Sequence, residues 1–129
     1  MGNPHAVIFL DDEPVESTVR SAGPILESSS CFPSRCNVHF AKVSDPRTIT
    51  LLTWERGSGP TLACGSGAGA VAVAGVLLGH ISRQVSIRQR GGTVKVDVDP
   101  VTAMVTLSGP ATHVYSGDVY SGQVCEQNV

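Results

Sequence analysis

The segment best suited to chemistry is Cys64-Gly65-Ser66-Gly67, which stands directly before a run of small apolar residues that extends to Gly79. The first N–H groups of a helix have no partner within the helix, and the helix dipole places partial positive charge there. Such an end can bind a carboxylate or a phosphate, and it lowers the pKa of a cysteine from about 8.5 toward the range of a working acid or base. Glycine on both sides of Ser66 leaves room for a ligand to approach the backbone. On its own, this segment is equally compatible with a buried structural cysteine before a glycine-rich helix.

The composition and length of the chain indicate a single globular domain and argue against a nucleic-acid-binding or membrane-spanning protein. The chain has 129 residues, of which 41% are hydrophobic and 16% charged, and its formal net charge is −2. This length fits one domain, residues 1–129. A negative net charge without a basic cluster argues against nucleic-acid binding, and no apolar run reaches the roughly 20 residues of a membrane span. The first residues lack the features of a signal peptide, so we expect reduced cysteines and a cytoplasmic protein. No second Cys or His pair lies at zinc spacing near Cys31 and Cys36, so we expect no metal site.

The elements that must position the cysteine follow from hydrophobic periodicity. We expect strands at residues 6–10, 37–43, 48–54, 84–88, 93–99, 103–107 and 113–119, a long helix at 65–80, and a short helix at 15–25 interrupted at Gly23-Pro24. We expect loops at 28–34 and 56–60. Ser66 is the only polar residue between 65 and 79, so the long helix should be buried on all sides. The predicted fold class is α+β, with a mostly antiparallel sheet whose strands wrap around this helix.

Four segments resemble signatures of diaminopimelate epimerase, and they occur in that family's order. They are residues 1–7 (MGNPHAV), 32–40 (FPSRCNVHF), 54–68 (WERGSGPTLACGSGA) and 107–117 (LSGPATHVYSG). The resemblance covers nearly the whole chain, and its most specific part is Glu-Arg-Gly followed by Ala-Cys-Gly. Family members have two similar halves, each a mostly antiparallel β-barrel around a central buried helix, with the substrate between them. The resemblance implies that this chain is the C-terminal half and that the N-terminal half is absent.

The resemblance also implies an activity. Family members are isomerases that convert L,L- to meso-diaminopimelate for lysine and peptidoglycan synthesis, without pyridoxal phosphate, another cofactor or a metal. One thiolate removes the α-proton, and a second thiol returns a proton on the opposite face. This chain supplies one of those two cysteines, whereas epimerisation needs a group on each face. The implied partners are therefore an amino-acid substrate and either the missing N-terminal half or a second copy, in a homodimer.

Residue by residue, the resemblance makes Cys64 one acid/base and places His5 and Glu55 beside it, where they help to set its protonation. The N–H groups of Gly65 and Ser66 correspond to those that hold the α-carboxylate. The other cysteines and histidines match no catalytic position, and we expect them to be structural or incidental: Cys31, Cys36, Cys125, His39, His80 and His113.

The remaining substrate-binding residues implied by the resemblance are amides and charged groups. Asn3 and Asn37 correspond to substrate-binding amides. Glu55 and Arg56 correspond to residues that hold the ammonium and carboxylate groups of the substrate, and their charges suit a zwitterion.

Two alternatives stay open. The chain could be a non-catalytic half-domain that binds a small zwitterion or complements a separate N-terminal half. It could also share the fold but act on proline, hydroxyproline or histidine, as related racemases do. Asn3, Asn37 and Arg56 favour a substrate with a second polar head, and hence diaminopimelate. The implied pathway suggests a bacterial or plant source, with a plastid location in a plant.

Overall fold

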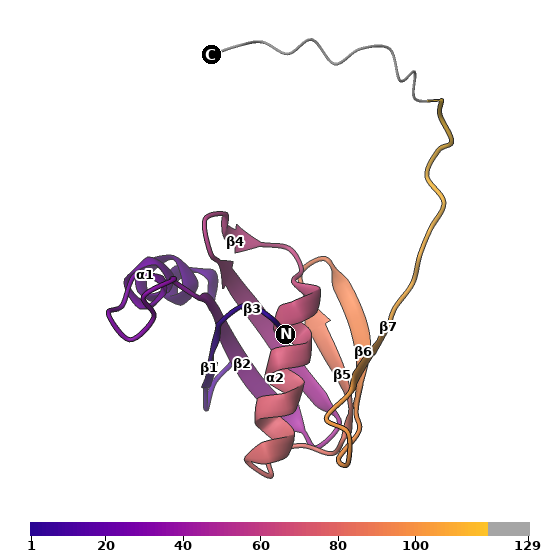
Figure 1. Ribbon diagram of the computed structural model, residues 1–129, viewed down its shortest axis with the longest axis horizontal. Coiled ribbons are helices and arrows are strands. Elements are labelled where there is room, and N and C mark those ends of the chain that lie inside the picture. The colour runs from indigo at the N-terminus through magenta and orange to yellow at the C-terminus, as the bar shows by residue number, and fades with distance from the viewer. Residues whose placement is uncertain (119–129) are drawn as a thin grey trace.

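A computed structural model describes residues 1–118 and shows a mixed, open sheet with a helix on each face (Figure 1). In chain order the elements are β1 (His5–Phe9), α1 (Glu16–Glu27), β2 (Asn37–Asp45), β3 (Thr48–Glu55), β4 (Gly59–Thr61), α2 (Gly65–Leu77), β5 (Gln84–Gln89), β6 (Gly92–Val98) and β7 (Val105–Ser108). The strand order is β1-β2-β3-β5-β6-β7, and β4 pairs with β3. β1 and β2 are parallel, as are β3 and β5, whereas the other pairs are antiparallel.

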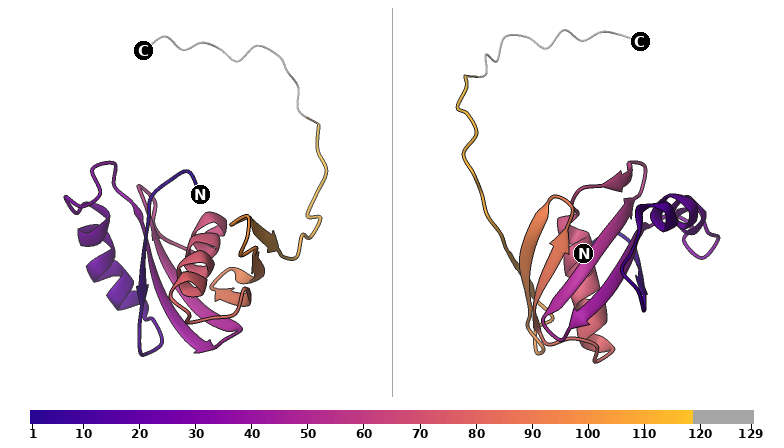
Figure 2. Two further views of the ribbon diagram at one scale, coloured as in Figure 1. Left: turned by 60° about the horizontal axis from the view of Figure 1, so that its bottom comes forward. Right: turned by 180° about the vertical axis from the view of Figure 1, so that it is seen from behind.

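Helix α2 lies across the inner face of the sheet (Figure 2, left). Ala68, Val71 and Ala72 of this helix are fully buried and pack in one cluster with Ile49 and Ile87 of the strands. The small residues of α2 allow a close approach between helix and sheet, because few side-chain atoms separate the two backbones. The sheet therefore fixes the start of α2, and with it Cys64.

Helix α1 covers the opposite face of β2 and β3 (Figure 2, right). It runs from Glu16 to Glu27 with Pro24 inside it, so the predicted interruption at Gly23-Pro24 is wrong. Gly23 lies against the indole of Trp54, where an added Cβ would come within 2.6 Å of Cγ. Pro24 cannot donate a backbone hydrogen bond, and the helix nevertheless continues past it to Glu27.

Glu27 joins the end of α1 to the loop that follows β3. Its carboxylate accepts hydrogen bonds from Trp54 Nε1 at 2.7 Å and from the Gly57 N–H at 3.1 Å, and it pairs with Arg35 at 3.4 Å. The hydrogen bond from Trp54 is the main reason why the pKa of Glu27 lies below its ordinary value. Glu27 thus orders the loop that carries Arg56.

We expect Glu27→Ala to lower the free energy of unfolding by about 1–3 kcal/mol, because the substitution leaves the N–H groups of Trp54 and Gly57 without their acceptor in a partly buried place. Urea denaturation followed by circular dichroism measures this. Glu16→Ala is the matched control on the same helix, since both ion pairs of Glu16, with Arg20 and with Arg90, are exposed. An equal loss of stability in the two variants would contradict this role for Glu27.

The predicted barrel is wrong in one respect: the sheet does not close around α2. Strands β1 and β7 are the two ends of an open sheet. The helix is consequently not buried on all sides, and the side chain of Leu77 is 80% exposed. The apolar character of α2 correctly indicates a helix that needs covering, but the described strands reach only one of its faces. Within residues 1–118, neither helix is long and apolar enough to cross a membrane.

Other differences are local. The loop predicted at 56–60 contains the start of β4, which pairs with β3. The long helix ends at Leu77 rather than at residue 80. The strand predicted at 113–119 is absent from residues 113–118, which have no regular structure, and Val119 lies outside the described residues.

Candidate functional site

The predicted site residues converge at one end of the sheet. The parallel strands β1 and β2 both begin there, with His5 paired to Asn37. Strand β3 runs in the opposite direction and ends there at Glu55, and α2 begins there at Gly65. This is the upper end of the molecule in Figure 1. Residues far apart in the sequence thus meet because three strand ends and one helix start share an edge.

Cys64 is the N-cap of α2 and only 6% exposed. Its Sγ accepts a hydrogen bond from the Gly67 N–H at 3.3 Å and lies 3.6 Å from Ser66 Oγ. Its own N–H donates to Gln89 Oε1 at 2.8 Å. Among the described residues the N–H groups of Gly65 and Ser66 have no acceptor, as expected for the first turn of a helix. Gly65 is exposed and Ser66 is half-buried, and a Cβ placed on Gly65 would meet no atom within 4 Å.

The pKa of the Cys64 thiol lies above its ordinary value, contrary to the lowering predicted from the helix start. Burial is the largest cause, and the neighbouring Glu55 side chain is the next. The Ser66 hydroxyl and the Gly67 N–H act in the opposite direction, but they are outweighed. At neutral pH Cys64 is therefore a thiol, with the Glu55 side chain beside it.

We expect Glu55→Gln to lower the pKa of the Cys64 thiol, because the substitution removes a negative charge that disfavours the thiolate. The pH profile of iodoacetamide alkylation, resolved for each cysteine by peptide mass spectrometry, measures this pKa. The pH at which Cys64 becomes reactive should fall in Glu55→Gln. The exposed carboxylate of Glu13 offers a control, and an equal shift in Glu13→Gln would contradict a local effect of Glu55.

Asn37 links two parts of the site. Its buried amide oxygen accepts from the Arg56 N–H at 3.0 Å, and its Nδ2 donates to the Pro4 carbonyl at 3.5 Å. The guanidinium of Arg56 is exposed and donates to the Ser34 carbonyl at 2.8 Å. In this structure both ends of the Asn37 amide are thus engaged within the protein, and Asn37 holds the Arg56 loop against the start of β1.

His39, which the sequence analysis set aside, is part of the same site. It is fully buried in β2, and its Nε2 lies 2.8 Å from Nδ1 of His5. The other nitrogen of His5 lies 3.0 Å from Asn3 Oδ1. The signal that could have identified His39 is the two-residue spacing from Asn37, since alternate residues of a strand share a face.

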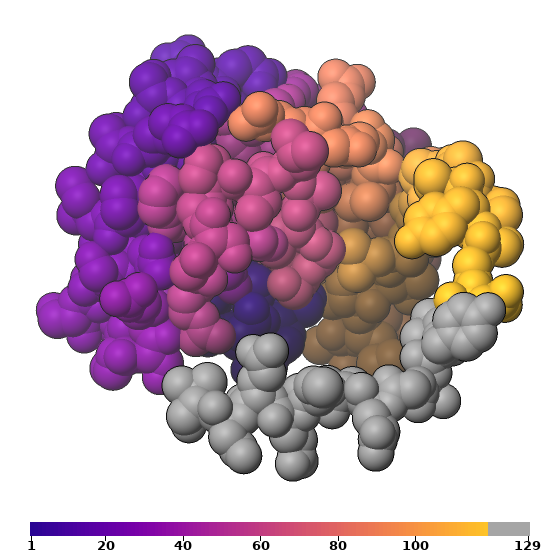
Figure 3. Space-filling model, turned by 90° about the horizontal axis from the view of Figure 1, so that it is seen from above, coloured from indigo at the N-terminus to yellow at the C-terminus, as the bar shows by residue number. Residues whose placement is uncertain are grey.

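An open hollow of about 620 Å³ lies beside Asn3 and His5. Asn3 and His5 line its polar end, and Ala70, Val73 and Leu77 of α2 line its apolar wall. Seen from above, the N-terminal residues (indigo) lie in the recess between the segment that begins α2 and the strand β7 (Figure 3). Cys64 is not among the residues that line this hollow. The structure therefore brings Cys64, Glu55, Gly65 and Ser66 together, and it places Asn3 and His5 on an adjacent surface.

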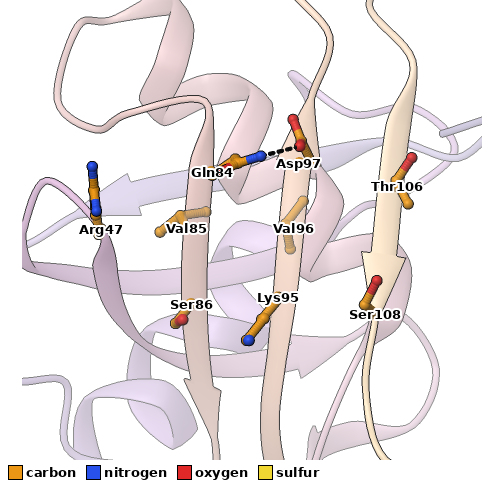
Figure 4. Close-up of a pocket in the computed structure, with 9 residues that line it drawn as sticks. All are labelled: Arg47, Gln84, Val85, Ser86, Lys95, Val96, Asp97, Thr106 and Ser108. Atoms are coloured by element: carbon orange, nitrogen blue, oxygen red, sulfur yellow. Dashed lines mark hydrogen bonds between the residues drawn. The ribbon is translucent and has the colours of Figure 1, made fainter.

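A second hollow, of about 440 Å³, lies on the outer face of β5, β6 and β7. Its polar lining includes Gln84, Lys95 and Asp97, and Gln84 donates to Asp97 at 2.6 Å (Figure 4). None of the predicted site residues lies there. Within the described part of the chain, Cys31, Cys36 and Cys64 are free thiols. Across residues 1–118, no group of three or more His, Cys, Asp or Glu side chains could hold a metal ion.

Comparisons with known proteins identify the family of this chain. The family model for diaminopimelate epimerase matches residues 1–114. The chain is 44% identical over 119 residues to the diaminopimelate epimerase of Synechococcus sp. (strain JA-2-3B'a(2-13)), with 91% of this chain and 42% of that protein covered. It is 47% identical over 120 residues to the diaminopimelate epimerase of Desulforudis audaxviator (strain MP104C), with the same shares covered. The chain thus spans about 42% of the length of these curated relatives.

Solved structures support the fold alone. A phenazine biosynthesis protein of the PhzF family from Enterococcus faecalis matches with a TM-score of 0.59 and 17% identity, over 77% of this chain and 35% of that one. The PhzF-family phenazine biosynthesis protein of Bacillus anthracis matches with a TM-score of 0.58 and 17% identity, over 83% of this chain and 34% of that one. Both matches therefore cover about a third of the solved chain.

Proposed function

The chain belongs to the diaminopimelate epimerase family, and on that premise we propose that it forms one of the two proton-transfer sites of a cofactor-independent amino-acid epimerase acting on diaminopimelate. The observation that carries this proposal is the surroundings of Cys64. A single thiol lies at the start of an apolar helix, with a carboxylate beside it and two free N–H groups next to it. An acid/base and an anion site are thereby within one helical turn.

The chemistry follows from the position of each group. The N–H groups of Gly65 and Ser66 hold the α-carboxylate and stabilise the negative charge that develops when the α-proton leaves. Cys64, as the thiol, gives its proton to the α-carbon, whose electron pair forms the new C–H bond while the charge stays on sulfur. In the reverse direction the thiolate removes the α-proton. The Gly67 N–H, 3.3 Å from Sγ, stabilises the thiolate in both directions, and Glu55 exchanges the proton of Cys64.

The partner of this half-site is proposed from the open face of the fold. A second proton-transfer group must lie on the other side of the α-carbon, because epimerisation adds the proton opposite to the side from which it leaves. The exposed Leu77 and the free edges of β1 and β7 leave apolar surface and backbone groups uncovered in residues 1–118. We propose that the N-terminal half completes the site. A second copy of this chain is the alternative, and sedimentation showing a monomer at micromolar concentration would exclude it.

The proposed substrate has a second polar head. Arg56 presents an exposed guanidinium and Asn3 an amide on the adjacent surface, in addition to the carboxylate site at the start of α2. These groups suit a diamino dicarboxylate better than proline or histidine, which lack a second carboxylate.

Titration of the ¹⁵N-labelled chain with meso-diaminopimelate, followed by NMR, tests the proposal. We expect the N–H signals of Gly65 and Ser66 to shift with saturation. The matched control is 1,5-diaminopentane, which has the same amine spacing but no carboxylates and should leave these signals in place. Equal shifts with the two compounds, or stronger shifts with proline or histidine, would contradict the proposed substrate. Binding without any α-proton exchange would favour the non-catalytic half-domain.

A further inference from the structure

Four polar side chains form a continuous hydrogen-bonded row across the start of the sheet. Thr53 Oγ1 lies 3.0 Å from His39 Nδ1, His39 Nε2 lies 2.8 Å from His5 Nδ1, and His5 Nε2 lies 3.0 Å from Asn3 Oδ1. The row begins in the core, where Thr53 is 4% exposed and His39 is fully buried. It ends at Asn3, which lines the open hollow beside α2.

The amide oxygen of Asn3 at one end of this row fixes the direction of every proton in it, because the Thr53 hydroxyl at the other end can donate or accept. Burial lowers the pKa of His5, and it lowers the pKa of His39 to about 3, so both rings are neutral near neutral pH. A neutral imidazole has one donor and one acceptor nitrogen, and an amide oxygen only accepts. Asn3 Oδ1 therefore requires the proton of His5 on Nε2, so His5 Nδ1 accepts from His39 Nε2. His39 Nδ1 must then accept from the hydroxyl of Thr53.

We propose that His39 is a positioning residue that, through His5, orients the Asn3 side chain so that its amide N–H₂ group faces the hollow as a donor for the substrate. Within residues 1–118 the Asn3 Nδ2 has no acceptor, and its Oδ1 is held by His5. The role assigned to the donor rests on the proposed function, since a carboxylate of diaminopimelate is the acceptor that it would meet. The row itself is a property of the ligand-free chain.

The packing around His39 holds its imidazole ring in this orientation. Its Cε1 lies against α2 at Gly67, where an added Cβ would be 2.3 Å away. Its ring also stacks on that of His5, with centroids 5.1 Å apart and an angle of 27° between planes. One face of His39 thus supports the start of α2, and one edge sets the tautomer of His5. The same residue connects the two parts of the site, Cys64 at the start of α2 and Asn3 just before β1.

The tautomers are directly observable. In the chain with ¹⁵N-labelled imidazoles, long-range proton–nitrogen spectra at neutral pH should show His5 and His39 as Nε2–H tautomers. His5 as the Nδ1–H tautomer would reverse the row, turn the Asn3 oxygen toward the hollow and overturn the proposal. Because this measurement uses the unmodified chain without ligand, it does not depend on the proposed function. If the tautomers are as expected but diaminopimelate does not bind, the proposed function is contradicted, whereas the proposed hydrogen-bonded row is supported.

Variants test whether His39 acts through His5. Asn3→Ala removes the acceptor of the His5 Nε2 proton and should shift His5 and His39 toward mixed tautomers, because the Thr53 hydroxyl can either donate to His39 Nδ1 or accept from it. Thr50→Val, which removes a hydroxyl outside the row, is the control and should change neither ring. His39→Leu should weaken binding of meso-diaminopimelate roughly five- to tenfold, the loss expected for one positioned hydrogen bond, while His39→Gln should restore most of it with its side-chain N–H₂. Unchanged tautomers in Asn3→Ala, or equal binding by His39→Leu and the wild type, would overturn the proposal.

Discussion

Cys64→Ser should lower the rate of α-deuterium incorporation into diaminopimelate in D₂O by roughly 10²–10⁴-fold, the usual contribution of a positioned acid or base. The variant keeps the shape of the N-cap and its hydrogen bond with the Gly67 N–H, but a serine hydroxyl is far too weak an acid to replace the thiol. Mass spectrometry of the amino acid measures the rate. The loss should therefore occur in a chain that stays folded and still binds the ligand.

The pH dependence provides a second check on the same group. Burial and Glu55 raise the pKa of the Cys64 thiol, so only a small fraction is thiolate at neutral pH. Removal of the α-proton needs the thiolate, and the wild-type exchange rate should rise with pH up to that raised pKa. Cys36→Ser is the matched control, because Cys36 is also buried but contacts the end of α1. Equal loss of exchange in Cys36→Ser and Cys64→Ser would contradict a specific role for Cys64.

Gly67→Ala should destabilise the fold by about 1–3 kcal/mol, a typical penalty for a side chain forced into a packed interior. The added Cβ would lie 2.3 Å from His39 Cε1 and 3.0 Å from Cys64 Sγ, so helix and ring must separate. Replacing glycine by alanine within a helix usually stabilises it by roughly 0.5–1 kcal/mol, and a net loss would show that the contact outweighs this gain. Urea denaturation measures the difference in the free energy of unfolding.

Gly65→Ala is the matched control for this substitution. It lies on the same helix, two residues earlier, where an added Cβ would have no neighbour within 4 Å. Its free energy of unfolding should stay within roughly 0.5 kcal/mol of the wild type. If Gly67→Ala were as stable as Gly65→Ala, the close packing of His39 against α2 would be contradicted. Gly67→Ala should also alter the alkylation rate of Cys64, because its Sγ accepts from the Gly67 N–H.

The sequence was sufficient for features that depend on local patterns. The apolar run after Cys64 correctly predicted α2. The alternation of residues 37–43 correctly predicted β2, and the β-branched residues of 48–54 correctly predicted β3. The resemblance to diaminopimelate epimerase is confirmed by the family model and by the relatives. Periodicity also predicted that α2 needs a covering layer, although the number of strands that reach it depends on long-range pairing.

Features that depend on contacts between distant segments were not predictable. The raised thiol pKa comes from burial and from Glu55 at the end of another element, so the effect of the helix start alone gave the wrong direction. His39 was set aside because it matches no catalytic position of the family, although its two-residue spacing from Asn37 places both residues on one face of β2. Its role appears only when β1 and β3 place His5 and Thr53 on its two sides. The packing of α1 at Gly23 likewise depends on Trp54, which is distant in sequence.

The central claim is that one chain carries one proton-transfer group, and the stereochemistry of exchange tests it most directly. The chain is incubated in D₂O with L,L- or meso-diaminopimelate at a concentration where sedimentation velocity shows a monomer. The α-deuterium content is measured by mass spectrometry, and the two isomers are separated by chromatography. A single group on one face predicts that deuterium enters one isomer with its configuration retained. Deuterium entering with inversion at an equal rate, or no deuterium entering a folded, ligand-bound chain, would contradict the claim.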